Sequence, residues 1–154
     1  MQPQTLSSER KKKLKKLKKL MDRQNERVLP TTTRFLETLN IVIDDAELDY
    51  LLSFGTQAHS FEAAAQKSDL PESELKTFLD TLCAKGFIKT IYTENNDEQY
   101  VLNAVLVGWF ESQVLYLIGN PDKKKLLKWG LWENIWKILK NTIFFPCAKY
   151  KMCF

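Results

Sequence analysis

Hydrophobic positions between residues 60 and 102 change from a helical spacing to a strand-like one, and this stretch carries the prediction of the fold. Ser60 can cap a short alanine-rich helix that begins at Phe61. After a polar turn, a second helix is predicted to start near Pro71 and to end before Gly86. Its apolar residues recur at i, i+3, i+4 and i+7 and define one buried stripe: Leu75, Phe78, Leu79 and Leu82.

Two short strands are predicted after the second helix. Residues 87–92 are rich in strand formers, residues 100–102 can pair back with them, and the polar residues 93–99 form the loop between. The order helix, turn, helix and two-stranded hairpin is the layout of a winged-helix domain. We therefore predict a mainly α fold of the α+β winged-helix type. It has a three-helix helix-turn-helix core with a small β-wing and helical extensions at both termini.

The residues before this stretch supply the first helix of the core. The β-branched run 41–43 predicts a small first strand. Asp44 or Asp45 is expected to cap the next helix, which Gly55 ends. The inward-facing residues of that helix are expected to be Leu48, Leu51 and Leu52.

Residues 1–29 are a low-complexity basic run, with ten Lys and Arg against three acids and a net charge of +7. Leu14, Leu17 and Leu20 recur every three residues, so they lie roughly on one side once the segment is helical. Charge runs at termini commonly do no specific work, and we expect a solvated arm that becomes helical when its lysines are neutralised. Two alternatives are contact with nucleic-acid phosphates and attraction to anionic lipid, for which the apolar stripe is narrow.

Charge divides the chain into three segments. Residues 30–120, the predicted winged-helix domain, hold five basic residues against fourteen acids, a net charge of −9. Residues 121–154 hold eight against two, a net charge of +6, and are predicted to form a basic, tryptophan-rich amphipathic helix and tail. An acidic body between two basic ends suggests that the ends meet something anionic, or meet the body itself.

The C-terminal helix is the predicted partner-binding element. Its apolar stripe at helical spacing includes Trp129, Trp132, Trp136 and Leu139. Such a stripe is usually buried against the same domain or a partner subunit, and less often lies at a membrane surface. We favour a homodimer or a protein partner, because winged-helix proteins often pair through terminal helices.

The exposed face of the second helix argues against direct reading of DNA. Helices that read the major groove present Arg, Lys, Asn or Gln to base edges, whereas residues 71–86 contain no Arg, Asn or Gln. The hairpin loop adds Glu94, Asp97 and Glu98, which repel phosphates. If DNA is bound, we expect the basic ends to grip it. The candidate contacts are Lys11, Lys12, Lys13, Lys15, Lys16, Lys76, Lys123, Lys124 and Lys125.

The sequence holds no catalytic set, so we predict no enzyme, no metal and no cofactor. His59 is the only histidine and precedes a helix, where a surface or capping role is expected. Cys83, Cys147 and Cys153 are too few and too widely spaced for a zinc or iron–sulfur site. The basic N-terminus lacks a following apolar stretch, and the longest apolar stretches are too short to span a membrane. We predict a cytoplasmic protein without a transmembrane segment.

The segment after the hairpin carries a family resemblance. Gly108, Trp109, Phe110, Glu111 and Gln113 are similar to the segment that follows the wing in the N-terminal winged-helix domain of bacterial and archaeal 4Fe-4S ferredoxin-like proteins. The resemblance covers roughly residues 41–122, and Ala104 stands where that family has a proline.

Those proteins carry cysteine-rich cluster motifs after this domain, whereas here only Cys147 and Cys153 follow. The resemblance therefore implies a detached or truncated accessory domain of a redox protein.

Two functions follow from these observations. The first is a non-enzymatic winged-helix protein-docking or regulatory module, accessory to an iron–sulfur redox protein. The alternative is a DNA-binding winged-helix transcriptional regulator that grips phosphates through its basic termini.

Overall fold

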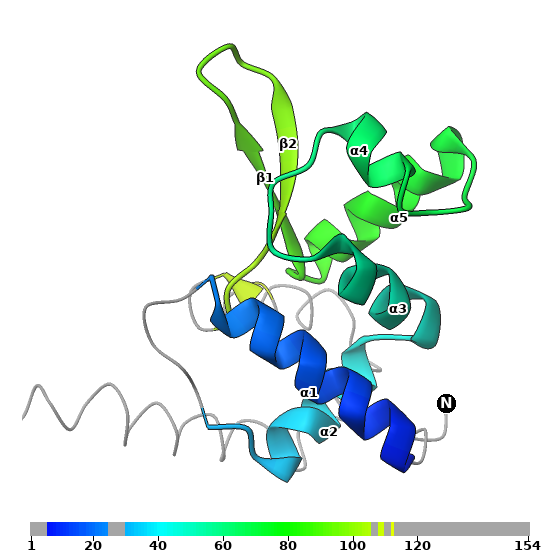
Figure 1. Ribbon diagram of the computed structural model, residues 1–154, viewed down its shortest axis with the longest axis vertical. Helices are drawn as coiled ribbons and strands as arrows, with labels where there is room; N and C mark the ends of the chain where they lie inside the picture. The colour runs from blue at the N-terminus through cyan, green and yellow to red at the C-terminus, as the bar shows by residue number, and fades with distance from the viewer. Residues whose placement is uncertain (1–5, 25–29, 106–107, 110–111, 113–154) are drawn as a thin grey trace, which may run out of the picture.

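The computed structural model describes residues 6–24, 30–105, 108–109 and 112, which form five helices and one two-stranded antiparallel sheet (Figure 1). The predicted fold class, mainly α with a small sheet, is confirmed. The helices are α1 (Ser8–Asp22), α2 (Thr33–Val42), α3 (Asp45–Phe54), α4 (Phe61–Ala65) and α5 (Glu72–Ala84). The strands are β1 (Ile88–Tyr92) and β2 (Glu98–Leu102).

Helix α1 is packed into the folded body, so the prediction of a solvated arm is wrong for residues 8–22. Leu14, Leu17 and Met21 are fully buried and belong to the same apolar cluster as the core of α3 and α5. The spacing of three and then four residues keeps this stripe on one side of the helix, which lies against α2 and α3 (Figure 1). Leu20, counted in the predicted stripe, is only partly buried.

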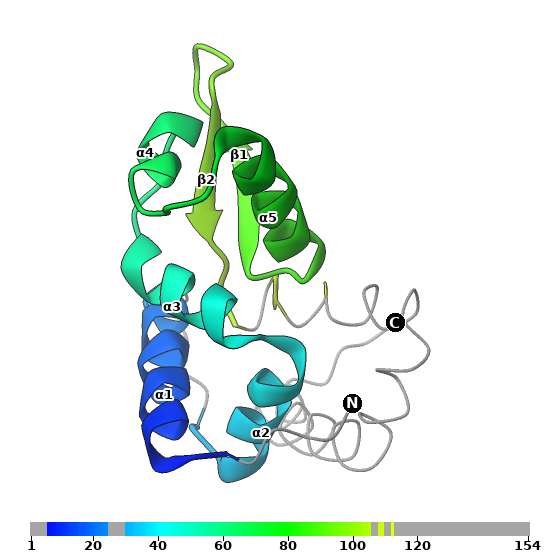
Figure 2. The ribbon, with the colours of Figure 1, turned by 90° about the vertical axis from the view of Figure 1, so that its right-hand side faces the viewer.

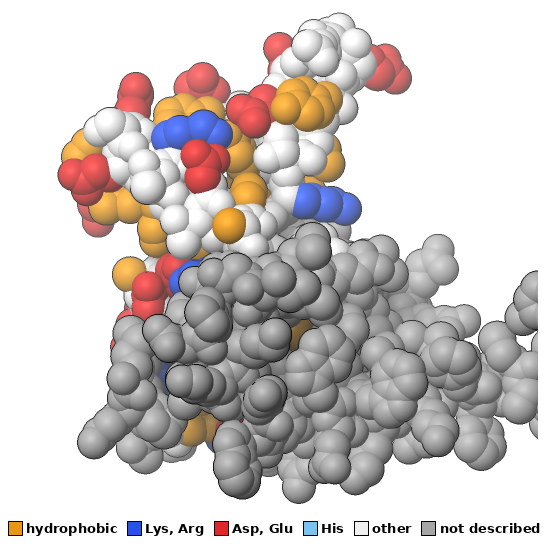
Figure 3. Space-filling view, turned by 180° about the vertical axis from the view of Figure 1, so that it is seen from behind, with side chains coloured by type: hydrophobic (Ala, Val, Ile, Leu, Met, Phe, Trp, Pro, Cys, Tyr) orange, Lys and Arg blue, Asp and Glu red, His pale blue; other side chains and the backbone are white. Residues whose placement is uncertain are grey.

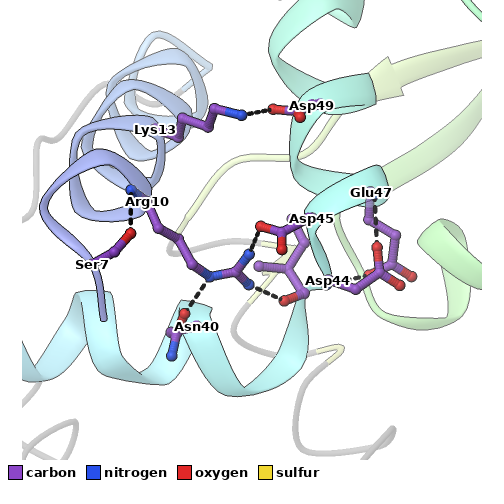
Figure 4. A network of polar contacts seen from close by, with 9 residues as sticks. Ser7, Arg10, Lys13, Asn40, Asp44, Asp45, Glu47 and Asp49 are labelled. Carbon is purple, nitrogen blue, oxygen red and sulfur yellow. Dashed lines mark hydrogen bonds and ion pairs between the residues drawn. The ribbon is translucent and has the colours of Figure 1, made fainter. Parts of the chain in front are cut away.

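Polar contacts fix the N-terminal half of α1 to the acidic body (Figure 4). The guanidinium of Arg10, only 7% exposed, donates to Asn40 Oδ1, to Asp45 Oδ1 and to the carbonyl oxygen of Ile43. Lys13 Nζ lies 2.6 Å from Asp49 Oδ1 on α3. The expectation that a basic end meets the acidic body itself is therefore confirmed for this helix.

The predicted first strand at residues 41–43 is wrong. Ile41 and Val42 complete α2, and Ile43 is its extended C-terminal cap, with φ −118° and ψ 136°. Val42 and Ile43 are buried in the core, and this packing overrides the β preference of their branched side chains. The residue that adds a third β-position is His59, which exchanges two backbone hydrogen bonds with Tyr100 of β2, at 2.9 and 2.8 Å.

The predicted helix boundaries between residues 44 and 86 are largely confirmed. Asp44 caps α3 in a capping box with Glu47, and Ser60 caps α4. Gly55 and Gly86 end their helices with φ of 79° and 70°, a backbone region that favours glycine. The stripe of α5 faces the core: Leu75, Leu79 and Leu82 are fully buried, and Phe78 is partly buried.

The hairpin projects from one end of the body, with α5 beside it (Figures 1 and 2). Its register pairs Ile88 with Leu102 at the base and Tyr92 with Glu98 near the tip. At the base, the buried ring of Trp109 packs against Phe35 of α2 at 5.6 Å and against Phe87 at 5.8 Å. This aromatic group joins the hairpin to the layer formed by α1 and α2.

Candidate interaction surfaces

The first candidate surface, the α5–hairpin face, combines exposed residues of α5 and of the hairpin (Figure 3). Its members are Glu72, Ser73, Lys76, Thr77, Asp80, Tyr92, Glu94, Asp97 and Glu98. Five of the nine are carboxylates and one is a lysine, while the exposed Lys89 of β1 lies on the opposite side of the hairpin from Tyr92. A surface with this balance repels a phosphate backbone and attracts a basic partner.

The single lysine of α5 is engaged within this face. Lys76 Nζ lies 2.8 Å from Asp80 Oδ1 and 3.4 Å from the hydroxyl of Tyr100, and it sits 5.8 Å from the centre of the Tyr100 ring. The bonds to Asp80 and Tyr100 raise the pKa of Lys76, so the amine stays protonated at neutral pH. The Tyr100 hydroxyl in turn donates to Glu98 Oε2 at 3.2 Å. This network leaves α5 with no uncommitted cation.

Tyr92 supplies an exposed aromatic side chain to the same face. It is 65% exposed and lies directly opposite Glu98, so the two side chains share one side of the hairpin. Ile91, which precedes it on β1, is also exposed, but on the opposite side of the hairpin. Aromatic residues are enriched in protein interfaces, and the sequence had indicated Tyr92 only as a strand former.

The predicted phosphate contacts fall into three groups. Lys12, Lys15 and Lys16 are exposed on α1, and Lys11 is half-exposed. Lys13 and Lys76 are committed to ion pairs with Asp49 and Asp80. The remaining predicted contacts lie outside the described residues: Lys123, Lys124 and Lys125, and the partner-binding residues Trp129, Trp132, Trp136 and Leu139.

His59 has a structural role that its sequence position did not indicate. It is half-buried rather than a surface cap: its Nε2 lies 2.8 Å from the carbonyl oxygen of Phe54, and its ring packs edge-on against the Phe54 ring. Cys83 is half-buried, and burial raises the pKa of its thiol, so the thiol is protonated at neutral pH.

Neither a metal site nor a membrane span is found in the part of the chain that the structure describes. Over these residues, no three His, Cys, Asp or Glu side chains are grouped so that they could hold a metal ion. Within the same residues, none of the helices combines the length and the apolar character needed to cross a bilayer.

Comparison with known proteins gives no match to any protein family, any curated protein or any solved structure.

Proposed function

We propose that this chain is a non-enzymatic docking or regulatory module, in which residues 45–102 form a winged-helix unit that binds a protein partner through the α5–hairpin face. The order α3, α4, α5, β1, β2 supports the winged-helix interpretation, as does the bridge between His59 and Tyr100, which adds a third β-position between α3 and α4. The resemblance to ferredoxin-like proteins adds an accessory role in an iron–sulfur redox system to this proposal.

The commitment of Lys76 to Asp80 and Tyr100 carries the proposal. A helix that reads DNA needs donors free to reach base edges and cations free to meet phosphates. The other charged members of the face are carboxylates. Each of them would be desolvated beside a phosphate of the same charge, which is unfavourable. A protein partner with basic side chains can instead pair with these carboxylates and cover Tyr92.

The alternative, a transcriptional regulator that holds DNA through its basic ends, is favoured by a different observation. Lys12, Lys15 and Lys16 are exposed on α1, away from the α5–hairpin face. In this alternative the protein contacts phosphates and leaves base reading to other elements. The predicted homodimer through the C-terminal helix remains compatible with either function.

The docking function is tested by a paired charge variant. We expect the double variant Glu94→Gln/Glu98→Gln to reduce the recovery of partner proteins cross-linked to this chain about tenfold. The reason is that neutral amides do not attract the basic side chains of a partner as carboxylates do. The control Glu9→Gln/Glu37→Gln removes two exposed carboxylates from α1 and α2 and should leave recovery unchanged. The readout is quantitative mass spectrometry of cross-linked material.

Two outcomes contradict the docking function. One is equal loss of recovery in the Glu94→Gln/Glu98→Gln variant and its control. The other is selection of a defined sequence from random DNA duplexes that Lys76→Gln abolishes, since that result makes α5 a reading helix. Deletion of residues 1–29 is a poor test, because it removes the fully buried Leu14, Leu17 and Met21.

A further inference from the structure

We infer that the outer side of α1 is a sequence-independent binding site for the phosphate backbone of nucleic acids. The site, which we call the α1 basic row, consists of Lys12, Lys15, Lys16, Lys19 and Arg23. It deepens the alternative function by fixing its residues, and it does not depend on the docking function of the α5–hairpin face.

Helical geometry places the row on one side of α1. Lys12, Lys16, Lys19 and Arg23 recur at i, i+4, i+7 and i+11, and Lys15 lies beside them; at about 100° per residue all five fall within about a third of the circumference. The buried stripe of Leu14, Leu17 and Met21 occupies the opposite side. Packing of that stripe therefore turns the basic row outward.

The same packing makes the row a fixed one. The helix is held at its start by Arg10 and Lys13, whose partners lie on α2, on α3 and in the turn between them. The row spans about 16 Å at 1.5 Å per residue, which is comparable with several phosphates of one DNA strand. A pre-folded row does not have to be ordered when it binds, so little conformational entropy opposes binding.

The cations of the row are available to a ligand. None of the five makes an ion pair or side-chain hydrogen bond with another described residue. Their neighbours Lys13 and Lys18 contrast with them, since these pair with Asp49 and Asp22. Two acids of α1 flank the row: the exposed Glu9 at its N-terminal end and Asp22, which is buried and paired with Lys18.

Nucleic acid fits this surface better than a membrane or a protein does. Helices that lie in a bilayer surface insert an apolar face, but the apolar residues of α1 are in the protein core. Protein interfaces have an apolar centre and are depleted in lysine, whereas the exposed residues of α1 are all polar or charged. A row of cations without an apolar centre is typical of contact with phosphates.

The test compares two double variants of the full chain that lose the same charge. The row variant is Lys12→Gln/Lys16→Gln, and the control is Lys67→Gln/Lys89→Gln on the α4–α5 turn and the hairpin. Glutamine keeps helix propensity close to that of lysine, so α1 should remain folded, which circular dichroism can verify. Binding to a short DNA duplex of arbitrary sequence is measured by fluorescence anisotropy from about 50 to about 200 mM salt.

We expect the row variant to flatten the slope of log K against log salt by about 2, since each lost phosphate contact lowers it by roughly 1. The control should keep the parent slope, and a second duplex of unrelated sequence should bind equally well. The inference is overturned if the parent does not bind the duplex at low salt or if the two variants lose binding equally. It is also overturned if the row variant keeps the parent slope. The same holds if the row variant weakens binding to phosphatidylserine vesicles but leaves binding to the duplex unchanged.

Discussion

Replacing Lys85 with methionine should lower the free energy of unfolding by about 3–5 kcal/mol. Lys85 and Glu47 form an ion pair between the C-terminal cap of α5 and the first turn of α3, and they are only 6% and 3% exposed. Methionine fills a similar volume but leaves the Glu47 carboxylate buried without its cation. Among the described residues, the carboxylate then keeps only its bond from the backbone amide of Asp44, at 3.0 Å.

The matched control is Lys13→Met. Its ion pair with Asp49 is half-exposed, so the expected cost is below about 1 kcal/mol. The double variant Glu47→Leu/Lys85→Met should recover much of the loss, because it removes the uncompensated charge as well. Urea unfolding followed by circular dichroism measures all three. A Lys85→Met variant as stable as Lys13→Met would show that the buried pair does not hold α3 to α5.

The second large effect is expected in α1, where Leu17→Ala should destabilise the whole domain by about 2–5 kcal/mol. Leu17 is fully buried among residues of the common core, and its truncation leaves a cavity between α1 and the rest of the domain. The loss should appear as one cooperative transition with a lower midpoint, measured by tryptophan fluorescence and by circular dichroism.

Lys16→Ala is the control for this prediction. Lys16 is exposed on the same helix, so its replacement should change stability by no more than about 0.5 kcal/mol. If Leu17→Ala were as mild as Lys16→Ala, α1 would not share the core of the domain. A separate, earlier transition in the parent would point to the same conclusion.

Local patterns predicted much of the helix-turn-helix and hairpin stretch. The stripe of Leu75, Leu79 and Leu82, the capping by Asp44 and Ser60, and the stops at Gly55 and Gly86 depend on neighbours a few residues away, which the sequence displays directly. The prediction of a strand at residues 41–43 was wrong because the strand propensity of these β-branched residues competed with burial, which depends on the rest of the fold.

The interaction surfaces were less accessible to prediction, because their character depends on pairs far apart in sequence. Arg10 meets Asp45, which lies 35 residues away, and Lys85 meets Glu47 at a separation of 38. The N-terminal basic run was predicted to be solvated because the sequence alone does not show that the acidic α3 lies beside it. Lys19 and Arg23 were not among the predicted phosphate contacts, because only the buried opposite side of α1 shows which basic residues remain outside.

Helix α1 belongs to the folded domain, so its exposed lysines form a fixed surface. Native-state hydrogen exchange of the full chain tests it most directly, by comparing the amides of Leu14, Leu17 and Met21 with those of Leu79 and Leu82 in α5. We expect the two sets to exchange with similar opening free energies, because both helices are buried in one core. Exchange of the α1 amides at the rate of an unstructured chain, with α5 still protected, would contradict the claim.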